Sequence, residues 1–261
     1  MNVIVCVKQV PDTTEVKINP ETNTLMREGV QSIVNPFDTY AIEEGIRLRE
    51  RQGGTVKALS MGPPQAKEAL LEAISMGVDD AYLLSDRAFA GADTLATSYT
   101  LAQAIKKLAP FDLVLCGRQA IDGDTGQVGP GIAEHLGVAH VSLVRKIREV
   151  HADLLVVERM TDDGFEVIEC RLPAVLTVVK EINEPRVPSI RGKLRAKSYQ
   201  VTTWTAADLG AEPERLGLGG SPTQVVKIFT PKRRGRGEML EGKVGEQAAA
   251  LCDRLREAGV L

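Results

Sequence analysis

A glycine-rich loop between an apolar strand and a helix constrains this sequence most. Residues 111–115 are a short apolar run of the kind that forms a fully buried strand, and a helical pattern covers residues 132–136. Between them the chain reads CGRQAIDGDTGQVGP over residues 116–130. The order strand, glycine-rich loop, helix presents bare backbone N–H groups at a helix N-terminus, so this stretch predicts a phosphate or nucleotide site.

The composition of the loop suits a nucleotide, but its pattern is not a known fingerprint. It matches neither the G-x-G-x-x-G of dinucleotide folds nor the G-x-x-x-x-G-K-[ST] of P-loops. An irregular surface turn, in which Gly and Asp are common, is therefore an alternative. Asp122, Asp124 and Thr125 have short side chains that can reach ribose or phosphate. Because two carboxylates repel a phosphate, we expect the aspartates to face ribose or solvent.

Alternation of strands and helices predicts the fold class. Strand candidates at 2–7, 55–60 and 81–84 are separated by helical segments of suitable length, which favours a parallel sheet with helices on its faces. The first strand should end near the glycine-rich loop, because ligands of open α/β sheets bind beyond the carboxyl ends of strands. This reasoning places residues 6–8, from Cys6 to Lys8, near the site. The fold class is therefore α/β, a Rossmann-like and mostly parallel sheet with helices on both faces.

The first helix has clear start signals. Asn35 is a candidate N-cap, Pro36 takes the first helical position and Asp38 lies in the first turn. A buried face is expected from the apolar periodicity, with the charged side chains of the helix mostly outside. The buried face comprises Ala41, Ile42, Ile46 and Leu48, and the charged side chains are Glu43, Glu44, Arg47 and Arg49.

The second half of the chain changes its periodicity. Strands at 154–157, 165–170 and 174–179 predict a β-hairpin extension of the sheet. The polar stretch 12–33, which contains the alternating piece 16–18, is expected to leave the sheet, as a hairpin in one interpretation. The chain should end in a C-terminal arm and a helix whose apolar face includes Val244, Ala248, Leu251, Leu255 and Cys252.

Charge and composition exclude several functions. The chain of 261 residues has a net charge of −3, which gives no basic field for nucleic acid, and the basic cluster 232–236 is expected to be solvated or to contact a partner. No apolar run of membrane-spanning length and no signal peptide is found, so we expect a cytoplasmic protein without membrane insertion. The four cysteines are far apart and are expected to be buried thiols, and no metal site is predicted.

Four motifs resemble the β subunit of electron-transfer flavoproteins. They are G-R-Q-A-I-D with T-G-Q inside 117–127, N-P-F-D at 35–38, M-G-P at 61–63 and N-E-P-R at 183–186. They occur in the order of the family and span most of the chain. The resemblance implies that an adenine nucleotide is enclosed by Cys6, Asn35, Pro36, Phe37, Asp38, Met61, Ala120, Asp122, Gly123, Asp124, Thr125, Gly126, Gln127, Val128, Gly129 and Pro130. The signals at 35–38 are also explained by the start of a well-capped helix alone, without a ligand.

The stretch 85–98 decides between two branches of this family. Asp93 is a candidate N-cap, and the hydroxyls of Thr94, Thr97 and Ser98 share one helix face, although capping alone explains the aspartate. The sequence F-A-G-A-D-T-L-A-T-S is similar to electron-bifurcating members, which hold a second FAD here, whereas housekeeping members bind AMP and have a longer loop at 122–125. The FAD contacts implied are Phe89, Ala90, Gly91, Asp93, Thr94 and Thr97, with the diphosphate near 125–130.

Residues beyond 182 suggest contacts with partners. The stretch 183–197 contains two prolines and five basic residues, and a solvated linker is one interpretation. The resemblance implies instead a recognition loop that docks on partner dehydrogenases through Ile190 or Leu194. It also implies that the arm and terminal helix pack on the α subunit, with packing on this same chain as the alternative. We therefore divide the chain into a nucleotide-binding domain, 1–182, and a partner-binding part, 183–261.

The resemblance implies the β subunit of an electron-bifurcating flavoprotein. NADH would reduce FAD on this subunit, and electrons would pass to ferredoxin or flavodoxin and, through the FAD of the α subunit, to a dehydrogenase of acyl-CoA type. One alternative is a housekeeping subunit that binds AMP, and another is a regulatory nucleotide-binding module without redox chemistry. No serine–histidine–acid set or carboxylate pair suggests side-chain catalysis, so a bound cofactor would supply the chemistry. Arg118 is a candidate to stabilise anionic flavin, with a structural salt bridge as the alternative.

Overall fold

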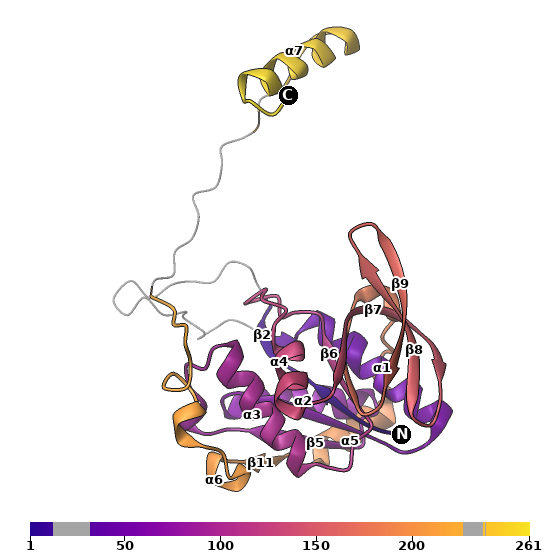
Figure 1. The fold of residues 1–261 in the computed structure, drawn as a ribbon, viewed down its shortest axis with the longest axis vertical. Helices are drawn as coiled ribbons and strands as arrows, with labels where there is room; N and C mark the ends of the chain where they lie inside the picture. The colour runs from indigo at the N-terminus through magenta and orange to yellow at the C-terminus, as the bar shows by residue number, and fades with distance from the viewer. Residues whose placement is uncertain (13–31, 227–236, 238) are drawn as a thin grey trace. The chain divides into compact units, whose positions relative to one another are not determined.

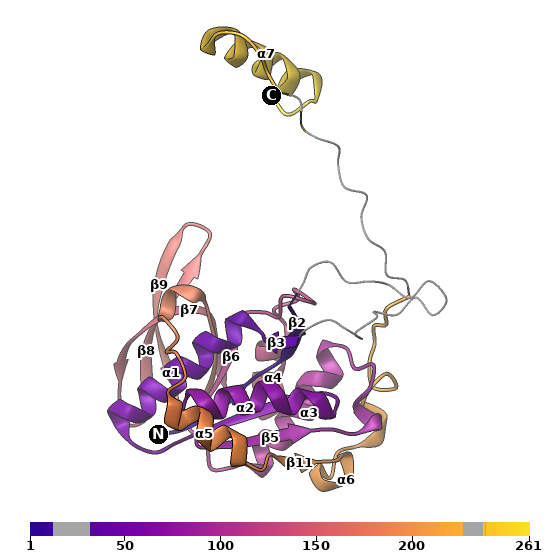
Figure 2. The same ribbon diagram turned by 180° about the vertical axis from the view of Figure 1, so that it is seen from behind.

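The computed structural model describes residues 1–12, 32–226, 237 and 239–261. The chain forms two compact units, residues 1–226 and 227–261. In the first unit, α3 and α4 cover one face of a large sheet, and α1, α2 and α5 cover the other (Figures 1 and 2). The predicted α/β Rossmann-like fold is confirmed. The division at residue 183 concerns packing on a partner and stays a prediction.

Within the described residues, nine strands form the main sheet in the order β11-β5-β4-β1-β6-β10-β7-β8-β9. The strands from β11 to β7 run parallel, and β8 and β9 are antiparallel additions. A separate pair, β2 and β3, is antiparallel. The strands are β1 (Asn2–Cys6), β2 (Gln9–Pro11), β3 (Ser32–Val34), β4 (Thr55–Met61), β5 (Asp80–Leu84), β6 (Leu113–Gly117), β7 (Ala139–Val150), β8 (Leu154–Thr161), β9 (Gly164–Arg171), β10 (Ala174–Val178) and β11 (Thr202–Trp204).

The helices of the first unit connect these strands, and α7 belongs to the second unit. They are α1 (Pro36–Gln52), α2 (Lys67–Met76), α3 (Thr94–Lys107), α4 (Val128–Leu136), α5 (Ile190–Ser198), α6 (Ala206–Leu209) and α7 (Val244–Glu257). The short 3₁₀ helices are η1 (Pro64–Ala66), η2 (Arg87–Phe89), η3 (Lys180–Ile182) and η4 (Pro213–Arg215). No helix in the described part of the chain combines the length and apolar character needed to cross a bilayer.

The core has two layers, one on each face of the sheet. Val3 and Val5 of β1 belong to the layer with α1 and α2, whereas Ile4 and Cys6 belong to the layer with α3 and α4. A parallel strand that is covered on both faces must be apolar at nearly every position, which explains the continuous apolar runs. The strand order changes direction between β1 and β6, because α1 follows β1 on one face and α3 precedes β6 on the other. Ligands of open α/β sheets bind at such a point.

Two predictions about the first helix are wrong in detail. Asn35 stands at the N-cap position of α1, but its side chain caps nothing and bonds elsewhere. Glu43 and Glu44 are buried rather than exposed. Arginines and an asparagine from α1 and the segment 183–186 cover both carboxylates and compensate their charge.

The β extension is confirmed and larger than expected. β8 and β9 form a hairpin around a turn at 162–163, and they extend from the long strand β7, which the sequence did not predict. β10 returns to the middle of the sheet, between β6 and β7. The three-residue β11 joins the opposite edge beside β5 and was also not predicted.

The remaining predictions concern residues outside the described part of the chain, the terminal helix and the cysteines. The alternating piece 16–18 and the basic cluster 232–236 fall outside the described residues. The terminal helix is confirmed as α7. Cys6, Cys116 and Cys170 are buried thiols as expected, but Cys252 of α7 is exposed.

Candidate functional site

Asp38 connects β1, β6 and the start of α1, which meet where the strand order changes direction, here called the switch point. Its carboxylate accepts hydrogen bonds from the backbone N–H of Lys8 (2.7 Å) after β1 and of Gly117 (3.2 Å) at the end of β6. It also accepts one from the Asn35 amide at 3.0 Å. A side chain at Gly117 could not be accommodated, since a Cβ there would lie 2.4 Å from the Asp38 carboxylate. The start of α1 is thereby fixed against the ends of both strands.

Asn35 carries the connection into the glycine-rich loop. Its side-chain amide donates to the carbonyl of Gln119 (2.9 Å) and its Oδ1 accepts from the N–H of Ile121 (3.2 Å). Asn35 is 1% exposed, and its bond to Asp38 is buried, whereas its two bonds to the loop are partly buried. The side chains of Asn35 and Asp38 are therefore occupied by the protein, and they shape the site by positioning the loop.

Burial changes the acidity of two groups beneath the loop. It raises the pKa of Asp38 to about 7, although the three N–H donors favour the charged form. Cys6 and Cys116 lie on the neighbouring strands β1 and β6. A hydrogen bond with Cys6 and then burial raise the pKa of the Cys116 thiol well above its usual range, so it stays protonated.

Both aspartates of the loop have partners within the protein. Asp122 forms an ion pair with Lys8, with 2.6 Å between the carboxylate oxygen and Nζ, and Asp124 accepts a hydrogen bond from the amide of Gln119. Asp124 adopts a left-handed backbone (φ 55°) at the end of a turn closed by its N–H to the carbonyl of Ala120. The repulsion that these aspartates would exert on a nearby phosphate is thus reduced.

The N-terminus of α4 fits an anion. Among the described residues, no side chain caps its first turn. Free N–H groups at a helix start attract phosphates. Gly129 and Gly131 allow close packing there, since a Cβ at Gly129 would lie 2.4 Å from Thr177 Cγ2 and one at Gly131 would lie 2.6 Å from Ser98 Oγ. Pro130 has no N–H and the Gly131 N–H bonds to the Gln127 carbonyl, so Val128 and Gly129 supply the backbone donors of this turn.

The N-terminus of α3 is different, because Asp93 caps it. The Asp93 carboxylate accepts from the N–H groups of Leu95 (2.9 Å) and Ala96 (3.1 Å), which confirms the predicted N-cap. The hydroxyl of Thr94 donates to Gln127 Oε1 at 2.9 Å and so joins α3 to the residue that precedes α4.

A groove of about 360 Å³ lies between the first turns of α3 and α4. Its lining combines polar groups of both helix starts with the apolar side chains of Leu95 and Pro222. It is lined by Asp93, Thr94, Leu95, Ser98, Gln127, Gly131, Pro222 and Thr223. This shape and lining suit an extended ligand with both polar and apolar parts.

The predicted site residues fall into two groups that the loop connects. Cys6, Asn35, Pro36, Phe37, Asp38 and Met61 lie at the ends of β1 and β4 and the start of α1, and Asp93, Thr94 and Thr97 lie at the start of α3. Phe89 is buried in the core of the α3 side, so its side chain is a packing element. Ala90 accepts a hydrogen bond from the Leu218 N–H, and Gly91 lies against the Leu218 side chain.

Sequence reasoning placed Lys8 near the site, at the end of the first strand, but not its ion pair with Asp122, which spans 114 positions of the chain. Two residues of the groove carried no clear signal in the sequence. Pro222 and Thr223 line the groove from a segment about 130 positions away from Asp93. Only the fold brings these residues to the site.

Comparison with known proteins decides the family. The model of the electron transfer flavoprotein domain matches residues 22–209. An electron transfer flavoprotein subunit β from Thermoanaerobacterium thermosaccharolyticum is 53% identical over 262 residues, covering 100% of both chains. The chain belongs to the electron transfer flavoprotein β-subunit family. Electron transfer is the role of that family.

Two further relatives of this flavoprotein subunit carry other names. The caffeyl-CoA reductase-Etf complex subunit CarD of Acetobacterium woodii is 51% identical, with 100% of both chains covered. Protein FixA of Bradyrhizobium diazoefficiens is 44% identical over 98% of this chain and 91% of its own. Within the residues that the structure describes, no three His, Cys, Asp or Glu side chains gather as ligands of a metal ion would.

Arg118 of this flavoprotein subunit is engaged within the loop. Its guanidinium carbon lies 5.3 Å from the centre of the Phe37 ring, and its Nε donates to Gln119 Oε1 at 2.8 Å. Such stacking of a cation on an aromatic face is favourable. Phe37, another predicted site residue, therefore helps to hold the arginine over the start of α1.

The segment with the predicted docking residues is a helix rather than an irregular loop. Ser189 caps α5 by accepting from the N–H of Gly192 at 3.0 Å. Ile190 and Leu194 are 81% and 61% exposed. Behind them, α5 packs closely on α2, since a Cβ at Gly192 would lie 2.0 Å from the Ser75 carbonyl oxygen.

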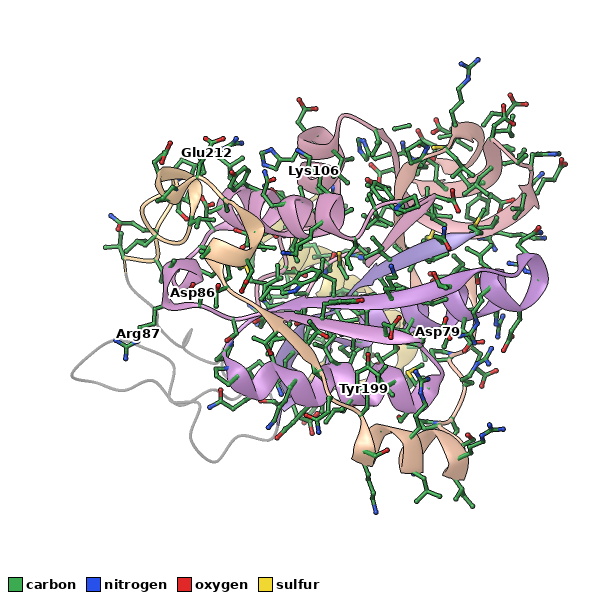
Figure 3. All side chains as sticks on the ribbon, turned by 90° about the horizontal axis from the view of Figure 1, so that it is seen from below. Asp79, Asp86, Arg87, Lys106, Tyr199 and Glu212 are labelled. Atoms are coloured by element: carbon green, nitrogen blue, oxygen red, sulfur yellow. The ribbon has the colours of Figure 1, made fainter. Side chains whose placement is uncertain are left out.

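The end of α5 is attached to the start of β5. Arg195 donates to the carbonyls of Val78 (2.7 Å) and Asp79, and Tyr199 Oη accepts from the Ala81 N–H at 2.9 Å. Figure 3 shows Asp79 and Tyr199 near β5 and the end of α5. The helix that carries the two apolar side chains is thus bonded to the sheet.

Proposed function

We propose that the chain is the β subunit of an electron-bifurcating electron transfer flavoprotein. In this proposal it binds FAD and NADH is its electron donor. Ferredoxin or flavodoxin is one electron acceptor, and a dehydrogenase of acyl-CoA type, reached through the FAD of the α subunit, is the other. Bound FAD supplies the ability to accept a hydride and to release electrons one at a time.

One observation supports FAD over a smaller nucleotide. The same loop is attached at Asp122 to Lys8, beside the switch point, and at Gln127 to Thr94, beside the groove between α3 and α4. The two groups of site residues therefore lie along one continuous loop. A dinucleotide can use both groups, whereas a mononucleotide needs one.

Each part of the site has a role in this proposal. The adenine end lies at the switch point, next to the segment 35–38 and the ends of β1 and β4. The diphosphate takes the N–H groups at the uncapped start of α4, near residues 125–130. The remainder of the cofactor extends toward Thr94 and Thr97, where the exposed Leu95 offers an apolar contact.

Exposed apolar side chains support the proposed protein partners. Phe165 and Val167 on the β8–β9 hairpin and Val244 and Leu251 on α7 are exposed, as expected of surfaces that an α subunit covers. A CoA-linked partner is suggested by the CarD relative, whose name places it in a complex with a caffeyl-CoA reductase. Ile190 and Leu194 are the proposed anchors for such a dehydrogenase.

A housekeeping carrier that holds AMP is the second candidate. It is favoured by the hydrogen bonds among the site residues at the switch point. Lys8, Asn35 and Asp38 are bonded to one another and to the loop without any residue of α3, so this part of the site could hold one nucleotide by itself. In that case the groove beside Thr94 would have no part in cofactor binding.

An anaerobic titration tests the proposal. The heterodimer with its α subunit is mixed with NADH, and the flavin absorbance is followed. We expect NADH to reduce the flavin in stoichiometric amounts, and Thr94→Val to lower this reduction while the matched variant Thr203→Val, on the edge strand β11, leaves it unchanged. Flavin that NADH leaves oxidised, but that a reduced acyl-CoA dehydrogenase reduces, would establish the housekeeping role instead.

A further inference from the structure

The segment 216–223 folds against the loop that precedes α3. Leu216 is buried in the core layer of α3, and the N–H of Leu218 donates to the carbonyl of Ala90 at 3.0 Å. Gly217 has a left-handed backbone (φ 52°), and a Cβ there would lie 2.3 Å from the Ala88 carbonyl oxygen. This close fit shows that the segment belongs to the first unit, and it leads directly into residues 227–261.

Asp93 is shared between α3 and this segment. Its Oδ1 caps the helix, whereas its Oδ2 accepts from both the N–H (3.1 Å) and the hydroxyl (2.8 Å) of Thr223. In return, the backbone N–H of Asp93 donates to Ser221 Oγ at 2.8 Å. Burial opposes ionisation, but the hydrogen bonds from Thr223, Ala96 and Leu95 outweigh it and lower the pKa of Asp93, so the acceptor is a carboxylate.

The same contact forms a wall of the groove. Pro222 and Thr223 line it together with Thr94 of α3 and with Gln127 and Gly131 of the α4 side. The chain that leads to this segment is attached near the end of β5. There Asp86, labelled in Figure 3, accepts from the N–H of Ala206, the first residue of α6, at 3.0 Å.

We propose that Asp93 and Thr223 are positioning residues that couple cofactor binding in the groove to attachment of the segment 216–223. The inference rests on the proposed function, because it takes the groove as part of the cofactor site. When the Asp93–Thr223 contact is made, the wall is in place and the groove holds its ligand. A bound ligand in turn holds the wall, since the coupling between two binding events is reciprocal.

Two variants separate this contact from the helix cap. Asp93→Asn keeps an oxygen that accepts from Leu95 and Ala96, because asparagine is a good N-cap, but its NH₂ group cannot accept from Thr223. Thr223→Ala removes the hydroxyl alone. The matched control is Asp208→Asn, because Asp208 accepts from Thr205 in a similar capping arrangement on α6.

The experiment uses the heterodimer with its α subunit and FAD as the probe. Hydrogen–deuterium exchange of peptides covering 216–226 is compared with and without FAD, and the release rate of the FAD held by this subunit is measured for each variant. We expect FAD to protect these peptides, Asp93→Asn and Thr223→Ala to release FAD about tenfold faster, and the double variant to add little to either single one. Asp208→Asn should behave as the wild type.

Unchanged FAD release in both variants, together with exchange that does not respond to FAD, would overturn the inference while leaving the proposed function intact. A wild-type heterodimer that binds no second FAD would instead contradict the proposed function. That result would overturn the inference as well, because a nucleotide held without the groove leaves the Asp93–Thr223 contact with nothing to couple to. The FAD content of the wild type therefore distinguishes the two failures.

Discussion

Asp38 illustrates how one residue can shape a candidate site through its contacts with the protein. Sequence reasoning gave it a place beside an adenine nucleotide, and the structure shows its carboxylate occupied by Lys8, Asn35 and Gly117. The side chain therefore acts on the site by fixing β1, α1 and β6 relative to one another. Replacing it should damage the protein before it affects cofactor chemistry.

We predict that Asp38→Asn destabilises the protein. The NH₂ group of asparagine would face one of three N–H donors, and a buried donor left without an acceptor costs about 1–3 kcal/mol. Urea unfolding of the variant should show this loss in the free energy of unfolding. The matched control is Asp163→Asn in the exposed turn of the β8–β9 hairpin, which should change stability by less than about 0.5 kcal/mol.

The difference in stability between the wild type and Asp38→Asn should change with pH in a defined direction, because only the wild type has the titrating carboxyl group. Burial raises the pKa of Asp38 to about 7, above its ordinary value of 3.8, so the folded state holds the proton more tightly than the unfolded state. The contribution is fully present below pH 3.8 and is lost as the pH rises through 7. The stability advantage of the wild type over Asp38→Asn should therefore shrink between pH 4 and 8. An advantage that grows over this range would show that the three donors outweigh burial.

At the scale of elements, an ion-pair cluster joins α1 to the segment that precedes α5. Arg186 donates from Nε to Glu43 at 2.7 Å and from Nη1 to Glu50 at 2.6 Å. The carboxylate of Glu43 is 2% exposed, and Arg47 also contacts it. Hydrogen bonds from Arg186 and Arg47 outweigh the effect of burial and lower the pKa of Glu43. This cluster holds the start of the proposed docking element.

We predict that Arg186→Ala loosens that element. Removing one partner of a buried ion pair is strongly destabilising, but Arg186 is one-third exposed, so we expect a loss of about 1–3 kcal/mol. Faster hydrogen exchange over residues 183–198 and weaker binding of the partner dehydrogenase should accompany it. Because the pKa of Glu43 is lowered, this stabilisation is present above the ordinary pKa of glutamate and is lost as the pH falls.

The control for this variant is Arg87→Ala, since Arg87 is an exposed residue of η2. Its exchange over 183–198 should equal that of the wild type. If Arg186→Ala also left that exchange unchanged, the cluster would not position α5.

Elements buried on both faces were predictable, and edge elements were not. β1, β4, β5 and β6 have continuous apolar runs because helices cover both faces of the sheet. β7 was missed because bulges break its alternation, and Leu143 even adopts a left-handed backbone. β11 has three residues on one edge, too few for a pattern. The burial of Glu43 and Glu44 depends on Arg186 and Asn183, about 140 positions away.

At the scale of the whole molecule, the site could be predicted only where its residues are close in sequence. The glycine-rich loop, the segment 35–38 and the start of α3 each carry local signals of loops and helix starts. Their arrangement follows from the crossover of the sheet at β1 and β6. The contacts of Lys8 with Asp122 and of Thr223 with Asp93 join segments more than 100 positions apart, and no local pattern predicts them.

The central claim is that one continuous loop serves both groups of site residues, so that this subunit holds FAD. The direct test is to purify the chain with its α subunit, denature the complex, and count the released FAD and AMP per heterodimer. We predict two FAD and no AMP. One FAD with one AMP would contradict the account and would show that the groove between α3 and α4 takes no part in binding the cofactor.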